Sequence, residues 1–127
     1  MALLLDTHAF IWWLEGLSKL PKSAREAIME QEVFVSAASA WEIATKYRLG
    51  RLPSVASIVN DIAGAIASQK FQQLAVSVIH GQRAGLLPGT HRDPFDRMLI
   101  AQARSEDLTL VSNEKIFDTY GVDRLWS

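Results

Sequence analysis

Five acidic residues lie where predicted strands or helices begin or end. They are Asp6 after an apolar run, Glu42 early in a predicted helix, Asp93 and Asp96 at the start of another, and Glu114 after a second apolar run. Carboxylates in one cleft repel one another by about 4 kcal/mol per pair at 4 Å in an effective dielectric near 20, so a cation or a shared proton normally offsets them. Oxygen ligands suit Mg²⁺ or Mn²⁺, and the chemistry that they favour is metal-assisted phosphoryl transfer.

Each acid also has an interpretation in which it does no chemistry. Asp6 and Asp93 precede predicted helices, and Asp is a preferred N-cap residue. A solvated helix face would account for Glu42, and an exposed turn would account for Glu114. Asp96 would be explained by pairing with a neighbouring arginine. The arginines within reach in sequence are Arg92 and Arg97.

The apolar pattern predicts the elements that position these acids. Leu3, Leu4 and Leu5 show no polar alternation, which predicts a strand buried on both faces, as inside a parallel sheet. Asp6 then lies at the carboxyl end of that strand. Because ligands of open α/β sheets bind in the crevice beyond those ends, an acid there is a candidate for function.

Strands and helices alternate along the rest of the chain. Further strands are predicted at residues 33–35, within 71–76, at 108–111 and at 122–126. Helices are predicted at 9–16, 22–31, 36–49 and 77–87, and Leu17 continues the apolar pattern of the first. Further helices are predicted from a cap at Ser54 through residue 66, from residue 93 onward, and briefly through Phe117. This alternation predicts one α/β domain over residues 1–127, a three-layer sandwich with a central parallel sheet of four to five strands flanked by helices.

Composition limits the function classes. The chain is 49% hydrophobic and 21% charged, as in soluble globular proteins, and no apolar run approaches the roughly 18 to 20 residues that span a bilayer. The buried strand follows Met1 almost at once, so we expect no secretion signal, no membrane partner and a cytoplasmic location. The lack of cysteine excludes disulfides, thiolate metal ligands and a cysteine nucleophile. A net charge of −1 means that any nucleic-acid contact must come from a local patch.

Taken together, these residues resemble the PIN domain, and in particular the VapC-type toxins of type II toxin–antitoxin pairs. The matching stretches are LDTH at 5–8, VSAASAWEI at 35–43, HRDPFDRMLIA at 91–101 and LVSNE at 110–114, followed by Phe117. They are spread over nearly the whole chain. The combination is therefore far more specific than any single acid.

The resemblance implies a ribonuclease that cuts single-stranded or structured RNA with Mg²⁺ or Mn²⁺. By this likeness the catalytic metal ligands are Asp6, Glu42, Asp96 and Glu114. The fourth position is usually Asp in a Thr-x-Asp pattern, whereas here Ser112 leads to Glu114, an acid that is one methylene longer. Auxiliary roles, such as orienting acids or water by hydrogen bonds, are expected for three further residues. These are Thr7, Asp93 and Ser112.

The resemblance also implies partners, namely a second copy of the chain and a small antitoxin whose C-terminal segment lies in the acidic cleft. Basic residues near the acids are candidates for holding RNA phosphates. The main candidates are Arg92 and Arg97, followed by Lys46, Arg48, Arg51 and His91. Aromatic residues offer an apolar surface for the antitoxin, although core burial would equally explain them. They are Trp12, Trp13, Trp41 and Tyr47.

Two other functions fit parts of the sequence. One is a PIN-like scaffold that has lost its activity and only binds, but such a scaffold would be expected to lack acids that are present here. The other is a phosphotransfer domain in which an aspartate after a strand accepts phosphate, as in receiver domains or haloacid-dehalogenase-like phosphatases. Those phosphatases carry an Asp-x-Asp pair, whereas Asp6 is followed by Thr7 and His8.

Overall fold

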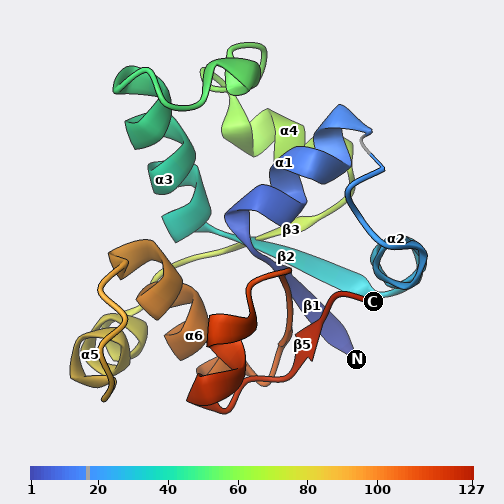
Figure 1. Ribbon diagram of the computed structural model, residues 1–127. Coiled ribbons are helices and arrows are strands. Elements are labelled where there is room, and N and C mark those ends of the chain that lie inside the picture. The colour runs from blue at the N-terminus through green and yellow to red at the C-terminus, as the bar shows by residue number, and fades with distance from the viewer. Residues whose placement is uncertain (17) are drawn as a thin grey trace.

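One five-stranded sheet organises the chain, and the computed structural model describes residues 1–16 and 18–127 (Figure 1). The strands are β1 (Ala2–Leu5), β2 (Glu32–Ser36), β3 (Gln72–Leu74), β4 (Thr109–Val111) and β5 (Arg124–Leu125). They lie in the order β3-β2-β1-β4-β5, and every pairing is parallel. The predicted parallel sheet of four to five strands is therefore confirmed.

Helices connect the strands. They are α1 (Thr7–Glu15), α2 (Lys22–Glu30), α3 (Ala37–Arg48), α4 (Ile62–Ser68), α5 (Val78–Leu86) and α6 (Pro94–Glu106), with the 3₁₀ helices η1 (Pro53–Val55) and η2 (Lys115–Tyr120). The predicted caps Ser77 and Asp93 do begin α5 and α6. Leu17, which the pattern placed on the first helix, lies outside the described residues. None of the described helices is long and apolar enough to cross a membrane.

Strand β1 lies in the middle of the sheet and is buried on both faces. Leu3 and Leu5 pack on one face with apolar side chains of α1, α2, α3 and α4. Leu4 packs on the other face with α6, η2 and β4. The three leucines thus join two cores on opposite sides of the sheet, which explains why their run contains no polar residue.

The single helix predicted over residues 54–66 is wrong. The chain forms η1, turns, and enters α4 only after Asp61, whose carboxylate accepts a hydrogen bond from the Gly64 amide at 2.9 Å. This cap starts a new helix in the middle of the apolar stripe. The stripe still contributes to the core, because Val55 and Ile66 are buried.

The sheet has a point where its connections change direction. From β1 the chain moves outward through β2 and β3, and then returns to the other side of β1 with β4 and β5. Such a reversal opens a crevice beyond the carboxyl ends of the two strands that flank it. Asp6 follows β1 and Ser112 follows β4, so the fold places both residues at this crevice.

Phe117 provides a test of the core on the α6 face. Its ring is 1% exposed and packs in the cluster that contains Leu4. Phe117→Ala is expected to lower the free energy of unfolding by about 3 to 5 kcal/mol, because it removes buried apolar surface and leaves a cavity. Urea denaturation measures the loss. The neighbouring Ile116, 40% exposed, is the matched control, and equal losses for Phe117→Ala and Ile116→Ala would contradict the placement.

Candidate active site

Asp6 has two roles at the carboxyl end of β1. Its Oδ1 accepts a hydrogen bond from the Ala9 amide at 2.7 Å, so it caps α1. Its own amide donates to the Val111 carbonyl at 3.0 Å, which joins it to the end of β4. The side chain is buried at the crevice. The cap interpretation of Asp6 is confirmed.

The pKa of Asp6 reports its surroundings. Burial raises the pKa from its usual value of 3.8 to about 6, against the hydrogen bonds from Ser112 and the Ala9 amide, which lower it. The negative charge of Glu114 adds to the rise. The Asp6 carboxylate therefore lies in a partly dry site within the field of a second acid.

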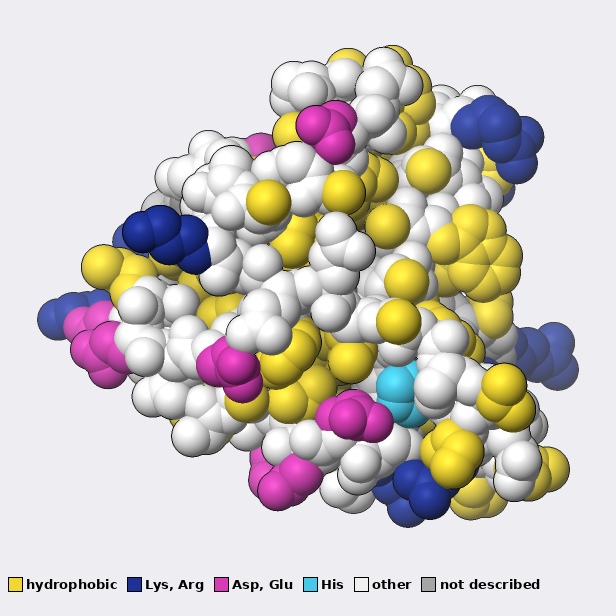
Figure 2. Space-filling view, turned by 180° about the vertical axis from the view of Figure 1, so that it is seen from behind, with side chains coloured by type: hydrophobic (Ala, Val, Ile, Leu, Met, Phe, Trp, Pro, Cys, Tyr) yellow, Lys and Arg dark blue, Asp and Glu magenta, His cyan; other side chains and the backbone are white. Residues whose placement is uncertain are grey.

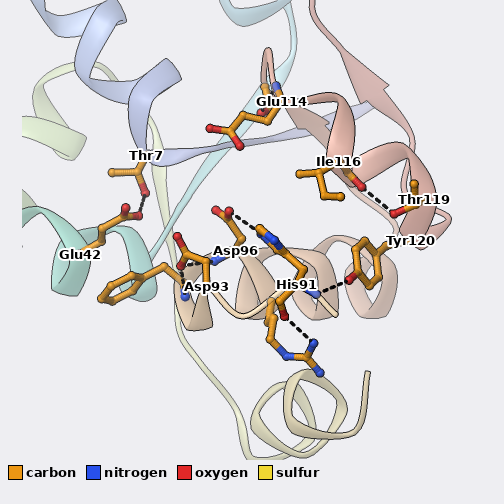
Figure 3. Close-up of polar contacts among 12 residues, drawn as sticks. Thr7, Glu42, His91, Asp93, Asp96, Glu114, Ile116, Thr119 and Tyr120 are labelled. Carbon is orange, nitrogen blue, oxygen red and sulfur yellow. Dashed lines mark hydrogen bonds and ion pairs between the residues drawn. The ribbon is translucent and has the colours of Figure 1, made fainter. Parts of the chain in front are cut away.

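Glu42 is not a solvated helix residue, because only 4% of it is exposed. Thr7 Oγ1 donates to Glu42 Oε1 at 2.6 Å (Figure 3). Lys46 Nζ contacts the other oxygen, Glu42 Oε2. A hydroxyl has one proton, so Thr7 accepts from Ser39, whose Oγ lies 3.0 Å away. Glu42 is thus held between α1 and its own helix α3. Thr7 makes a hydrogen bond to an acid, and its auxiliary role in the site stays a prediction.

Asp93 and Asp96 lie together at the start of α6. Asp93 Oδ1 accepts from the amides of Phe95 at 2.9 Å and Asp96 at 3.3 Å, so the predicted cap is confirmed. Burial raises the pKa of Asp96 to about 6, and the charges of Asp93 and Glu114 add to this rise. His91 Nε2 lies 2.8 Å from Asp96 Oδ2 and lowers the pKa (Figure 3). The neighbour that pairs with Asp96 is therefore this histidine, and the arginine pairing was wrong.

Glu114 is exposed, at the position that precedes η2. Its amide donates to Ser112 Oγ at 3.0 Å, and its carboxylate points toward the space between Asp96 and Thr7 (Figure 3). The expectation that Glu114 is an exposed residue is confirmed. The charge nevertheless acts on the site, because it raises the pKa of both Asp6 and Asp96.

Two arginines hold backbone segments near the site by hydrogen bonds to carbonyl groups. The Arg97 guanidinium donates to the carbonyls of Ala84 at 3.1 Å, Leu87 at 2.6 Å and His91 at 3.0 Å, so it fixes the segment before α6. Arg124 donates to the Ser112 carbonyl at 3.0 Å and pairs with Asp118. The sequence carries no signal for this role of Arg124. Arg92 is exposed, and RNA contact by Arg92 or Arg97 stays a prediction.

The donor set has the chemistry of a Mg²⁺ or Mn²⁺ site, since it consists of carboxylate oxygens without thiolate. Within residues 1–16 and 18–127, however, no three His, Cys, Asp or Glu side chains stand close enough together to hold a metal ion. Internal partners hold the Glu42 and Asp96 oxygens instead. The acids thus suit a hard cation in type, and coordination requires side chains to rearrange. The assignment of metal ligands stays a prediction.

A comparison with protein families matches residues 3–122 to the PIN domain. This chain belongs to the PIN domain family. The match includes all the acids described above and both strands that flank the crevice. A search of the curated proteins found no match for this PIN domain.

Solved structures share this fold at low sequence identity. VapBC2 from Rickettsia felis, bound to a promoter DNA fragment, is 14% identical over 100% of both chains, with a TM-score of 0.72. DNA-bound VapBC from Salmonella typhimurium is 19% identical over 98% of this chain and 97% of that chain, with a TM-score of 0.68. VapC20 of Mycobacterium tuberculosis, a toxin that cleaves the Sarcin-Ricin loop, is 15% identical over 98% and 99%, with a TM-score of 0.63. At these identities the likeness shows a shared fold.

The raised pKa values predict how stability changes with pH. A folded-state pKa above the unfolded value gives stability that is full below about pH 4 and is lost as pH rises through about 6. In metal-free buffer, Asp6→Asn is therefore expected to exceed wild type in stability at pH 7.5 by up to about 3 kcal/mol, and by much less near pH 4. Asn retains an oxygen that can cap α1.

Urea unfolding of both proteins across this pH range measures the difference. The matched control is Asp107→Asn, since Asp107 is exposed and, like Asn, tolerates the left-handed backbone that it adopts there. A stability difference between wild type and Asp6→Asn that does not change with pH would contradict a desolvated Asp6.

Proposed function

We propose that this PIN domain is a metal-dependent endoribonuclease toxin that cleaves structured or single-stranded cellular RNA in the cytoplasm and is neutralised by a cognate antitoxin. The observation that carries the proposal is the pair Asp6 and Asp96, both with a pKa raised to about 6 by burial and by the charge of Glu114. Carboxylates in this setting attract a divalent cation. The fold shared with a toxin that cleaves the Sarcin-Ricin loop supports RNA as the substrate.

Asp6, Asp96 and Glu114, together with Glu42 once it is released, would hold Mg²⁺ or Mn²⁺. When bound, such an ion lowers the pKa of water to form a nucleophile and stabilises developing charge on the leaving oxygen. The chain itself keeps the acids in place, through Thr7 on Glu42 and through Ser112 on Asp6 and Glu114. Partial burial strengthens the attraction between these carboxylates and any cation that enters.

The strand order argues against a receiver domain, which has the order 2-1-3-4-5 with its phosphate site at another switch point. An inactive PIN scaffold has one observation in its favour, since Glu42 and Asp96 are already paired within the chain. Metal binding separates the two functions. An inactive scaffold would bind no Mn²⁺ and cut no RNA, whereas the nuclease would do both.

The surface supports the proposed partners. On α5, the exposed apolar side chains Ile79 and Leu86 are seven residues apart and so lie along one face of the helix. In Figure 2, hydrophobic side chains gather at the lower right, where the reversed view of Figure 1 places α5. We assign this face to the second copy of a homodimer. Trp41 is 62% exposed and packs against Phe95. It borders an apolar groove lined by α3, α5 and α6, which we assign to the antitoxin segment.

The dimer can be tested at Leu86, which is 76% exposed near the C-terminus of α5. Leu86→Lys is expected to shift the protein from dimer to monomer, because it puts a charge into an apolar contact while suiting the helix C-terminus. Light scattering at matched concentration measures the mass. Met29→Lys is the control, since Met29 is 75% exposed near the end of α2. A dimer that survives Leu86→Lys would contradict the α5 interface.

The nuclease can be tested on purified protein that has been freed of any antitoxin. Incubation with total cellular RNA and Mn²⁺ is expected to yield discrete products on a gel. EDTA is expected to remove them, and Asp6→Asn and Asp96→Asn are each expected to lower the cleavage rate by more than about 100-fold, in line with the loss of groups that act at the reacting centre.

Asp107→Asn is the matched control for both variants, because it makes the same chemical change at an exposed helix end. It is expected to cleave like wild type. Products that persist in EDTA, or in the two site variants at the rate of wild type, would show that the nuclease activity comes from another source.

A further inference from the structure

Lys46 gives the acid cluster a positive charge of its own. It lies one turn after Glu42 on α3, and its Nζ contacts Glu42 Oε2. Thr7 already donates to Oε1 of the same carboxylate. Both oxygens of Glu42 therefore have partners inside the chain, and any cation that binds this acid must compete with one of them.

The pair differs from an ordinary surface ion pair. The side chains of Lys46 and Glu42 are 27% and 5% exposed. Lys22 and Glu26 on α2 have the same spacing, but they are 3.8 Å apart and are 83% and 57% exposed. Exposed pairs of this kind contribute little, whereas a buried carboxylate strongly needs a partner.

Lys46 also interacts electrostatically with acids outside its own helix. Burial lowers the pKa of Lys46, but the hydrogen bond and the charge of Glu42, with the charges of Asp93 and Asp96 on α6, raise it overall. The ammonium group is thus charged at neutral pH and lies within the field of acids from two helices.

We propose that Lys46 is a built-in competitor of the divalent cation, which holds Glu42 in the metal-free site and must leave Oε2 before an ion can use that oxygen. This inference rests on the proposed metal-dependent function and adds a regulation to it. An ammonium group and a divalent ion cannot share one carboxylate oxygen without strong repulsion. Lys46 therefore weakens metal binding and keeps the acids in place until the metal concentration is sufficient.

The direct test is the affinity for Mn²⁺ without RNA, measured from the electron paramagnetic resonance signal of free Mn²⁺. In Lys46→Met, which keeps the length of the side chain and removes the charge, the Kd for Mn²⁺ is expected to fall about tenfold, equivalent to about 1.4 kcal/mol. Lys46→Arg keeps the charge and is expected to bind like wild type. Lys22→Met removes a charge from the exposed pair and is expected to change nothing.

A thermal scan with and without Mn²⁺ checks that the variants fold. Lys46→Met is expected to have a lower Tm than wild type in EDTA, because Glu42 loses its counter-charge, and a larger rise in Tm on addition of Mn²⁺. An unchanged or higher Kd in folded Lys46→Met would overturn the inference.

A double-mutant cycle with Glu42→Gln shows whether Lys46 acts through Glu42. In the background of the Glu42→Gln variant, Lys46→Met is expected to lose its effect on the Kd for Mn²⁺. An effect of the same size in both backgrounds would overturn the competition at Oε2.

If wild type binds no Mn²⁺, the proposed function fails as well. If wild type binds Mn²⁺ and cuts RNA while its Kd does not depend on Lys46, only this inference fails.

Discussion

The burial of carboxylates at the carboxyl edge of the sheet is the constraint on which the rest of this PIN domain depends. Burial disfavours the charged forms of Asp6 and Asp96 relative to water, and it raises the pKa of each to about 6. The fold keeps them there because Asp6 joins the central strand β1 to α1, while Asp96 lies in the first turn of α6. Neither residue can move to solvent without disturbing an element that belongs to the core.

The chain offsets this constraint with local partners rather than with one large counter-charge. The Ala9 amide and Ser112 hold Asp6, Thr7 and Lys46 hold Glu42, and His91 holds Asp96. These contacts lie on different elements, so the site is stabilised piece by piece. Such an arrangement lets one acid change partners without the loss of the others.

Much of the fold was predictable because the strongest signals in this sequence are local. The unbroken run Leu3, Leu4 and Leu5 matches a strand with a core on each side, and Ser77 and Asp93 cap helices where their residue type predicts. The division of residues 54–66 was missed because the cap at Asp61 lies inside a continuous apolar stripe. There, periodicity alone cannot show that a helix stops and starts again.

The acids were found from their positions after predicted elements, but their partners depend on packing between distant segments. The pair Glu42 and Lys46 has a signal in its i, i+4 spacing. The contact of Arg124 with the Ser112 carbonyl has none, because it joins an edge strand to a loop through the tertiary fold. Nor could the sequence show that His91, rather than a nearby arginine, would pair with Asp96.

The pairing of β1 with β4 also has a consequence for synthesis of the chain. Leu5 pairs with Val111, so the two sides of the crevice come from opposite ends of the sequence. On the ribosome, the chain emerges from its N-terminus, and β1 can pair with β2 long before β4 exists. A nascent chain therefore carries Asp6 and Glu42 without the loop of Glu114. The crevice is complete only after β4 has left the ribosome, so Asp6 and the loop of Glu114 come together late in the synthesis of the chain.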